Sequence, residues 1–332
     1  MTHDPSSGRQ RVFIARALPG DAAERIAEAG FSVKVHPGES GPTRDELMAE
    51  SASCAGLLTL LGDRVDEELL DNAPGLKVVS NYAVGYDNID VDAATRRGVA
   101  VCNTPGVLTD ATAELALALL FSAARRTCEG DRFVRSGAFE GWSPMLLLGV
   151  EIRGKTLGIV GAGRIGQAVG QRAACLGCTV LYADGAAREA FETETGARRV
   201  PLDALLRASD FVSLHVPLTA ETRRMIGAPE LASMKPGAVL INTSRGPVVD
   251  EEALARALAE GPLRAAGLDV YEEEPAVHPA LLERDNVVLL PHLGSAAEET
   301  REAMARLATD NLLAALSGKR PAHLVNPEAF RA

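Results

Sequence analysis

Short apolar runs alternate with amphipathic segments through the first hundred residues. Segments 20–29 and 44–51 carry polar and apolar positions at helical spacing, while the runs between them have the length of buried strands. Strands that alternate with helices are typical of a parallel sheet. The predicted strands are RVFIARAL, FSVKVHP, AGLLTLL and LKVVSNY, at 11–18, 31–37, 55–61 and 76–82.

A long helical stretch, from Thr109 to about Arg135, connects this series to a second one. Near-continuous apolar strands separated by helices suit a doubly wound sheet with both faces covered. Beyond them, 295–318 has apolar residues at helical spacing and ends at Gly318, a suitable C-terminal signal. The six predicted strands of the second series are 155–160, 178–184, 211–217, 238–244, 265–270 and 286–291.

Length and composition narrow the class of protein. A chain of 332 residues exceeds the usual size of one hydrophobic core, so two domains are expected. A net charge of −11 leaves no basic stripe for nucleic acid. The most apolar stretch, Leu115–Ala124, is too short to cross a bilayer, and residues 1–10 show no secretory signal. We therefore expect a cytoplasmic protein with neither a nucleic-acid nor a membrane partner.

Five cysteines include one close pair, Cys175 and Cys178, between an apolar helix and a strand. Metal sites built on such a pair normally need a second one. Small buried thiols are the simpler interpretation, and no metal is expected.

A glycine-rich turn, Gly161-Ala162-Gly163-Arg164-Ile165-Gly166, follows the predicted strand KTLGIV and precedes a predicted helix. In a dinucleotide-binding turn the first glycine permits the tight bend, the second lets a pyrophosphate approach the backbone, and the third lets helix and strand pack closely. The N-terminus of the helix then faces the anion. The alternative is a glycine-rich turn in an α/β protein that binds no nucleotide.

An acidic residue supports the nucleotide interpretation. Asp184 ends the next predicted strand, where a carboxylate hydrogen-bonds the adenosine ribose diol. It would repel a 2′-phosphate, and no arginine follows within three residues, so NAD(H) is predicted in preference to NADP(H). Arg188, one residue further on, leaves NADP(H) open.

Three polar residues follow the ends of apolar strands: Arg245, Glu274 and His292. Ligands bind at the carboxyl ends of strands in such sheets. Each residue also has an ordinary explanation, because surface arginines form ion pairs, glutamates are common in turns and a histidine can fill a loop.

Taken together, the three residues and the segments around them resemble the D-isomer-specific 2-hydroxyacid dehydrogenase family. The resemblance extends roughly from Val12 to Pro327. The family's fold implies two Rossmann-like/flavodoxin-like domains with parallel sheets. It implies a central NAD-binding domain at 104–292, inserted into a discontinuous substrate-binding domain at 1–103 and 293–332, and a homodimer through the long connecting helix. The matching segments are NTPGVLTDATAELALALL, GKTLGIVGAGRIGQAV, SLHVPLTAETRRMIG, MKPGAVLINTSRGPVVDEEAL, AAGLDVYEEEP and PHLGSAAEETR.

Within the family, the segments SNYAVGYDNIDVDAATRRGVAVCNTP and GDRFVRSG look most like glyoxylate/hydroxypyruvate reductases. The resemblance implies reduction of a small 2-oxo acid to the D-2-hydroxy acid by hydride transfer from NADH. Arg245 would hold the substrate carboxylate and carbonyl, and His292 would give a proton to the ketone oxygen. Glu274, which directly precedes the proline, would keep the histidine protonated.

The resemblance assigns further residues to binding. The backbone N–H groups of Val84 and Gly85 would clasp the substrate carboxylate, although a plain turn is the alternative for this loop. Trp142, the only tryptophan, would reach a partner subunit's site or simply bury apolar area at the dimer surface. Asp269 would address the nicotinamide amide, and the cofactor cleft would also be lined by Thr109, Pro217 and Thr243.

Other specificities stay open. A 3-phosphoglycerate dehydrogenase would carry basic residues near the loop where Leu60 and Leu61 stand, and a phosphite dehydrogenase would carry a lysine in place of Val84. A 2-ketogluconate specificity belongs to the same family. A non-enzymatic NAD-sensing co-repressor shares the fold and the three polar residues, and only turnover separates it from an enzyme.

Overall fold

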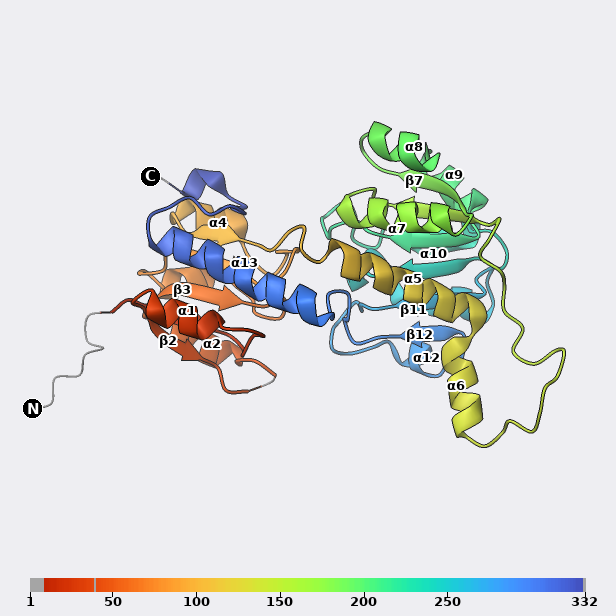
Figure 1. The fold of residues 1–332 in the computed structure, drawn as a ribbon, viewed down its shortest axis with the longest axis horizontal. Coiled ribbons are helices and arrows are strands. Elements are labelled where there is room, and N and C mark those ends of the chain that lie inside the picture. Colours follow the sequence, from red (N-terminus) through yellow and green to blue (C-terminus); the bar gives the residue numbers. More distant parts are fainter. Residues whose placement is uncertain (1–8, 39, 331–332) are drawn as a thin grey trace, which may run out of the picture. The chain divides into compact units, whose positions relative to one another are not determined.

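The computed structural model describes residues 9–38 and 40–330, which form two compact units (Figure 1). One unit takes in residues up to Leu108 and from Ala296 onward, and the other runs from Thr109 to Ser295. The predicted boundaries lay at 103/104 and 292/293. Residues 1–8, on which the expectation of no secretory signal partly depends, lie outside the described residues.

The first unit contains a five-stranded sheet in the order β2-β1-β3-β4-β5, with every pair parallel. Helices α2, α3 and α4 cover one face over a core that includes Phe13, Leu57 and Val79, and α13 packs against β3 and β4. Its elements are β1 (Arg11–Ile14), α1 (Ala22–Glu28), β2 (Ser32–Val35), α2 (Arg44–Ser51), β3 (Cys54–Thr59), α3 (Glu67–Asn72), β4 (Val78–Asn81), α4 (Val91–Arg96), β5 (Ala100–Cys102) and α13 (Glu298–Leu316).

The second unit contains a seven-stranded parallel sheet in the order β12-β11-β10-β9-β6-β7-β8. The six predicted strands are present, and the short β8 was missed because two exposed arginines carry no strand signal. The elements are α5 (Thr109–Arg125), α6 (Thr127–Arg135), β6 (Thr156–Val160), α7 (Arg164–Cys175), β7 (Thr179–Ala183), α8 (Glu189–Thr195), β8 (Arg198–Arg199), α9 (Leu202–Ala208), β9 (Phe211–Leu214), α10 (Ala228–Ser233), β10 (Val239–Asn242), α11 (Glu251–Ala259), β11 (Ala265–Leu268), α12 (Pro279–Leu282) and β12 (Val287–Leu289).

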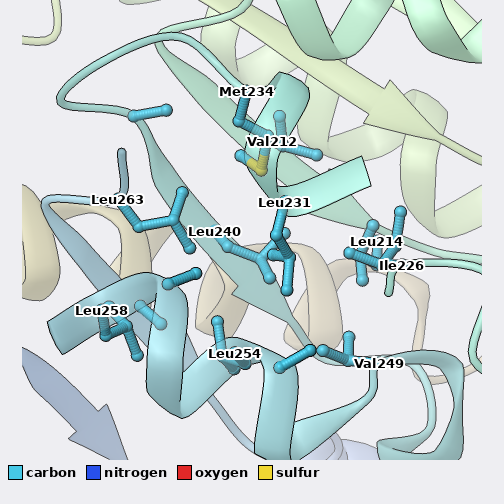
Figure 2. Close-up of a cluster of buried hydrophobic side chains, with 14 of the residues drawn as sticks. Val212, Leu214, Ile226, Leu231, Met234, Leu240, Val249, Leu254, Leu258 and Leu263 are labelled. Atoms are coloured by element: carbon cyan, nitrogen blue, oxygen red, sulfur yellow. The ribbon is translucent and has the colours of Figure 1, made fainter. Parts of the chain in front are cut away.

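Both faces of this sheet are buried, because successive strand residues point to opposite sides. Val239 and Ile241 pack toward α5 and α7, whereas Leu240 between them packs toward α10 and α11. Figure 2 shows the cluster on the face covered by α10 and α11, in which Leu240 of β10 lies near Leu254 of α11 and Leu231 of α10. The result is the doubly wound parallel sheet that the apolar runs predicted.

The predicted single helix from Thr109 to about Arg135 is wrong, because the structure divides it into α5 and α6. Arg126 between them has φ 56°, in the left-handed region that ends a helix. Its guanidinium bonds Glu129 in the first turn of α6, at 2.7 and 2.8 Å. Apolar spacing continues through the break, so periodicity alone did not reveal it.

Local signals fix several helix starts. Thr43 and Glu46 form a capping box at α2, and Asp250 caps α11 by accepting from Ala253 N. Across residues 9–38 and 40–330, no helix combines the length and the apolar character needed to span a bilayer.

Candidate active site

The glycine-rich turn lies between β6 and α7, and each glycine is needed for a different reason. Gly161 has φ +91°, and a Cβ there would stand 2.7 Å from the His215 carbonyl oxygen. A Cβ on Gly166 would stand 2.1 Å from the Gly161 oxygen. Around Gly163, by contrast, the space within 4 Å of a Cβ is empty. Open space at the N-terminus of a helix of 12 residues fits the pyrophosphate of a dinucleotide.

A pocket of about 810 Å³ adjoins this turn. Of the predicted cofactor residues, Gly161, Gly163, Asp184 and Pro217 border it. The pocket is also bordered by Arg188 and Arg199. Its lining does not include Thr109, Arg164, Ile165, Gly166, Thr243 or Asp269. For all ten residues the cofactor role stays a prediction.

Asp184 follows the end of β7 with both carboxylate oxygens engaged. Oδ2 accepts from Ala162 N at 2.8 Å, and Oδ1 accepts from Ala186 N and from Arg188 Nη2, each at 3.0 Å. Burial opposes ionisation, but these backbone donors and the Arg188 guanidinium hold the pKa of Asp184 below its usual value. The pocket therefore keeps a fixed negative charge beside two arginines.

Arg245, Glu274 and His292 follow three adjacent strands. β10, β11 and β12 pair in parallel, so the loops after them leave the same edge of the sheet. The three candidate reacting residues stand in those loops, and the charge of Arg245 lowers the pKa of Glu274. The structure thus brings together what the sequence proposed as separate candidates.

His292 and Glu274 form a hydrogen-bonded pair, with 2.8 Å between Nδ1 and Oε2. Burial alone would raise the pKa of Glu274, yet the hydrogen bond and charge of His292 keep that pKa low. An ionised carboxylate only accepts, so Nδ1 carries the proton and Nε2 is left for other partners. Glu274 is itself held, because Oε1 accepts from Tyr271 N at 3.0 Å. The side chain of His292 stays 32% exposed, so the imidazole is accessible.

The Arg245 loop is fixed by its own strand. Asn242 Nδ2 donates to the Arg245 carbonyl oxygen at 2.9 Å, and Arg245 Nη1 donates to the Ser244 carbonyl oxygen at 2.8 Å. The next residue, Gly246, is in close contact with the following strand's loop: a Cβ there would lie 1.8 Å from the backbone of Tyr271. Only glycine lets the loops of Arg245 and Glu274 approach this closely.

Two buried polar atoms at this edge lack a protein partner within the described chain: Asp269 Oδ2 and Thr243 Oγ1. Asp269 Oδ1 accepts from Leu293 N at 2.6 Å, and burial raises the pKa of the carboxyl. Buried polar atoms are normally hydrogen-bonded, so these two fit residues that meet a ligand. Asp269 lies beside His292, whose N–H donates to the Asp269 carbonyl oxygen at 2.9 Å, and this place fits a nicotinamide amide.

Val84 and Gly85 lie in the first unit, in the loop after β4. Their carbonyl oxygens accept from Asn103 Nδ2 at 2.7 Å and from Asn81 Nδ2 at 2.9 Å, respectively. The Val84 carbonyl shares its peptide plane with the Gly85 N–H, so its anchoring fixes the direction of that N–H group. The Val84 N–H shares its plane with the Ala83 carbonyl, which accepts from Thr104 N at 2.8 Å. Both N–H groups predicted to meet the substrate carboxylate are therefore fixed in direction.

Sequence reasoning missed three residues of this region: Gly246, His215 and Arg199. Gly246 follows Arg245 directly, and a glycine beside a candidate site residue is a signal of close backbone approach. His215 borders the pocket, and desolvation lowers its pKa to about 4. Arg199 bonds the Asp184 and Gly185 carbonyl oxygens at 3.0 and 2.9 Å. No sequence signal brings Arg199 to the pocket, because the approach depends on β8 pairing with β7.

The cysteine pair needs a correction, since Cys175 is exposed and only Cys178 is partly buried. Position 175 is the last residue of α7, on its solvent side. Within residues 9–38 and 40–330, no group of three or more His, Cys, Asp or Glu side chains is placed to hold a metal ion.

Fold and site together define a dinucleotide-binding oxidoreductase with an arginine and a histidine–glutamate pair at the carboxyl edge of its sheet. Residues 117–294 match the family described as D-isomer specific 2-hydroxyacid dehydrogenase, NAD binding domain. A glyoxylate reductase of Thermococcus litoralis is 51% identical over 97% of this chain and 98% of its own length. The chain belongs to the D-isomer specific 2-hydroxyacid dehydrogenase family.

Solved structures agree. The TT0316 protein of Thermus thermophilus has a TM-score of 0.90 at 46% identity, covering 95% of this chain and 100% of that one. An NADPH-dependent glyoxylate/hydroxypyruvate reductase of Sinorhizobium meliloti, solved with NADP and malonate, has a TM-score of 0.85 at 35% identity, covering 98% and 99%. These likenesses extend over both units of the chain.

Proposed function

We propose that this protein reduces a small 2-oxo acid of the glyoxylate or hydroxypyruvate type to the D-2-hydroxy acid. The observation that carries the proposal is the His292–Glu274 pair, 2.8 Å apart, on the loops after β12 and β11, of which the second is adjacent to the loop of Arg245. The relative from Thermococcus litoralis named glyoxylate reductase supports the substrate class.

Each side chain has one task in this proposal. Arg245 binds the substrate carboxylate through its planar fork and so orients the neighbouring carbonyl. His292 gives the proton on Nε2 to the carbonyl oxygen as it becomes an alkoxide, and Glu274 stabilises the imidazolium from the Nδ1 side. NADH, when bound, supplies the hydride. The first unit is proposed as the substrate-binding domain, in which the Val84 and Gly85 amides donate to a substrate carboxylate.

We propose NADH as the preferred cofactor. Asp184 keeps its negative charge at the pocket, where it can accept from a ribose hydroxyl and repel a 2′-phosphate. Asp269 and Thr243, whose Oδ2 and Oγ1 lack a protein partner in the described chain, are assigned to the nicotinamide end.

A homodimer is proposed through α6 and the segment that follows it. α6 buries none of its residues, and the segment extends away from the sheet of its own unit (Figure 1). Exposed apolar side chains gather there: Trp142 is 85% and Met145 is 74% exposed. A second copy of the chain is the proposed occupant, because apolar patches of this kind mark interfaces. The role of Trp142 in a partner's site stays a prediction.

The decisive experiment is a substrate panel. Glyoxylate, hydroxypyruvate, 3-phosphohydroxypyruvate and 2-ketogluconate are followed by the loss of NADH absorbance, and phosphite with NAD⁺ is followed by its gain. We expect turnover with glyoxylate and hydroxypyruvate.

A substitution tests the carboxylate contact. Arg245→Ala should raise KM and lower kcat for glyoxylate. Arg256→Ala, which removes an exposed arginine paired with Glu252 on α11, should change neither constant. Cofactor binding with no turnover of any substrate would favour the NAD-sensing alternative.

A further inference from the structure

The carboxylate that selects the ribose already has three donors from its own chain. Asp184 accepts from Ala162 N, Ala186 N and Arg188 Nη2, at 2.8, 3.0 and 3.0 Å. The two backbone donors belong to the glycine-rich turn after β6 and to the loop after β7. The Arg188 guanidinium is the one donor of the three that side-chain rotation can remove.

The backbone of Arg188 is held in place, whereas its guanidinium can change position. Its backbone N–H donates to Tyr182 Oη at 2.8 Å, and its carbonyl oxygen accepts from Glu192 N at 2.9 Å. Its side chain is 37% exposed and borders the pocket, and its Nε is buried with no hydrogen-bond partner among the described residues. An arginine carries five N–H donors, so the contact with Asp184 leaves most of them unused.

Arg199 adds a second positive charge at the same wall. Its Nε and Nη2 donate to the carbonyl oxygens of Asp184 and Gly185, which are neutral acceptors. Asp184, Arg188 and Arg199 together therefore carry a net charge of +1 at the place where the adenosine ribose is expected. A wall built only to exclude a 2′-phosphate would not carry two guanidinium groups.

We propose that Arg188 is a specificity-determining residue that lets this pocket accept NADPH as well as NADH. The proposal rests on the function proposed above. With NADH, Arg188 stays on Asp184, whose carboxylate also accepts from the ribose. With NADPH, the 2′-phosphate draws Arg188 away from Asp184, because a dianion binds the planar fork more strongly than a carboxylate does. The two backbone N–H donors then keep the freed carboxylate stabilised.

The test measures dissociation constants of NADH and NADPH by titration calorimetry on the whole protein, with steady-state kinetics on glyoxylate beside them. Arg188→Ala should raise the ratio of the NADPH constant to the NADH constant by about tenfold or more, the size of one charge-assisted hydrogen bond. Arg188→Lys should restore part of the lost NADPH affinity, because the charge returns without the fork.

Arg207→Ala is the matched control. Arg207 also pairs with an aspartate four residues earlier, Asp203, but it does not border the pocket. Its removal should leave the ratio within about twofold of the unmodified protein. If Arg188→Ala gives the same ratio as Arg207→Ala, or weakens both cofactors equally, the pair is only structural and the proposal is wrong. A protein that binds neither cofactor contradicts the proposed function instead.

Discussion

His292 holds a backbone conformation that most side chains avoid. Its φ of 55° lies in the left-handed region, which costs a non-glycine residue about 1 kcal/mol. Two contacts stabilise it there: the N–H donates to the Asp269 carbonyl oxygen at 2.9 Å, and the ring bonds Glu274 at 2.8 Å. Backbone and ring are thus fixed from opposite ends, which orients Nε2.

Replacement of His292 by Asn tests the ring without disturbing the turn. Asn tolerates left-handed backbone, so the loop should keep its shape while the proton donor is lost. We expect kcat for glyoxylate reduction to fall by at least ~100-fold, as for a positioned general acid, with Tm changed by only about 1–2 °C. His323→Asn, in the other unit of the chain, is the control. A rate within about tenfold of the unmodified protein would remove His292 from the proton-donor role.

His215 makes a prediction about pH and stability. Its pKa in the folded protein is about 4, against an ordinary value of 6.5, because its ring is desolvated. The unfolded chain therefore takes up a proton as pH falls from 6.5 toward 4, while the folded chain does not. The contribution of His215 to stability is fully present above pH 6.5 and is lost across this window.

The measurement is the free energy of unfolding in urea at several pH values, for the unmodified protein and for His215→Asn. Between pH 6.5 and 4 the unmodified protein should lose up to about 3 kcal/mol more than the variant. Carboxylates titrate in both proteins, so the difference between the two curves isolates the histidine. Parallel curves would show that His215 is freely hydrated.

At the scale of elements, the site depends on how closely two loops approach. The loop after β10 carries Arg245, and the loop after β11 carries Glu274. They meet where Gly246 contacts the backbone of Tyr271. A Cβ on residue 246 would lie only 1.8 Å from the Tyr271 carbonyl atoms. Neither loop can be moved by rotating a side chain, because the obstructing atoms are backbone.

Gly246→Ala should therefore damage the site as a whole. We expect kcat/KM for glyoxylate to fall by about tenfold or more, and the free energy of unfolding to fall by about 1–3 kcal/mol, as for overpacking. Gly75→Ala, in the turn before β4, is the matched control, since a Cβ there meets only the Cys54 carbonyl oxygen, at 3.8 Å. Equal kinetics in the two variants would mean that the loops adjust without consequence for Arg245.

The features that could be predicted from the sequence are those that depend on residues close together in the chain. Apolar runs of strand length predicted both parallel sheets, and the spacing of glycines before a helix predicted the Gly161–Gly166 turn. Glu274 could be placed beside His292 only through a resemblance, because 18 residues separate them and the contact depends on β11 pairing with β12. The break at Arg126 was missed because apolar spacing continues through it, and the approach of Arg199 was missed because it depends on β8 pairing with β7.

At the scale of the whole molecule, each unit buries its own sheet, but one segment stays uncovered. From Val134 in α6 to Leu148, five large apolar side chains are at least 48% exposed: Val134, Phe139, Trp142, Met145 and Leu148. Scattered exposed apolar residues are ordinary, whereas five within 15 residues of one segment are not. The free energy lost by hydrating them is recovered if a second copy of the chain covers them.

We expect the unmodified protein to sediment as a dimer, and Trp142→Ser combined with Met145→Ser to dissociate it. Each buried apolar side chain contributes roughly 1.5–3 kcal/mol, so the loss of both pairs of contacts should raise the dimer dissociation constant by at least ~100-fold. Sedimentation velocity across a range of protein concentrations measures this constant.

The control is Leu176→Ser, because Leu176 is also exposed, at 38%, but it follows α7 and lies outside the segment. If association were unspecific, the control variant and the double variant would both have a raised dimer dissociation constant. If the segment forms a specific interface, only the double variant will. A monomer in the unmodified protein, or a dimer equally stable in the double variant, would show that a second copy does not cover this surface.

Kinetics of the same double variant then separate the two roles of Trp142. If activity is lost in step with dissociation, Trp142 of the second copy completes the site. If the monomer retains activity, Trp142 only buries apolar area.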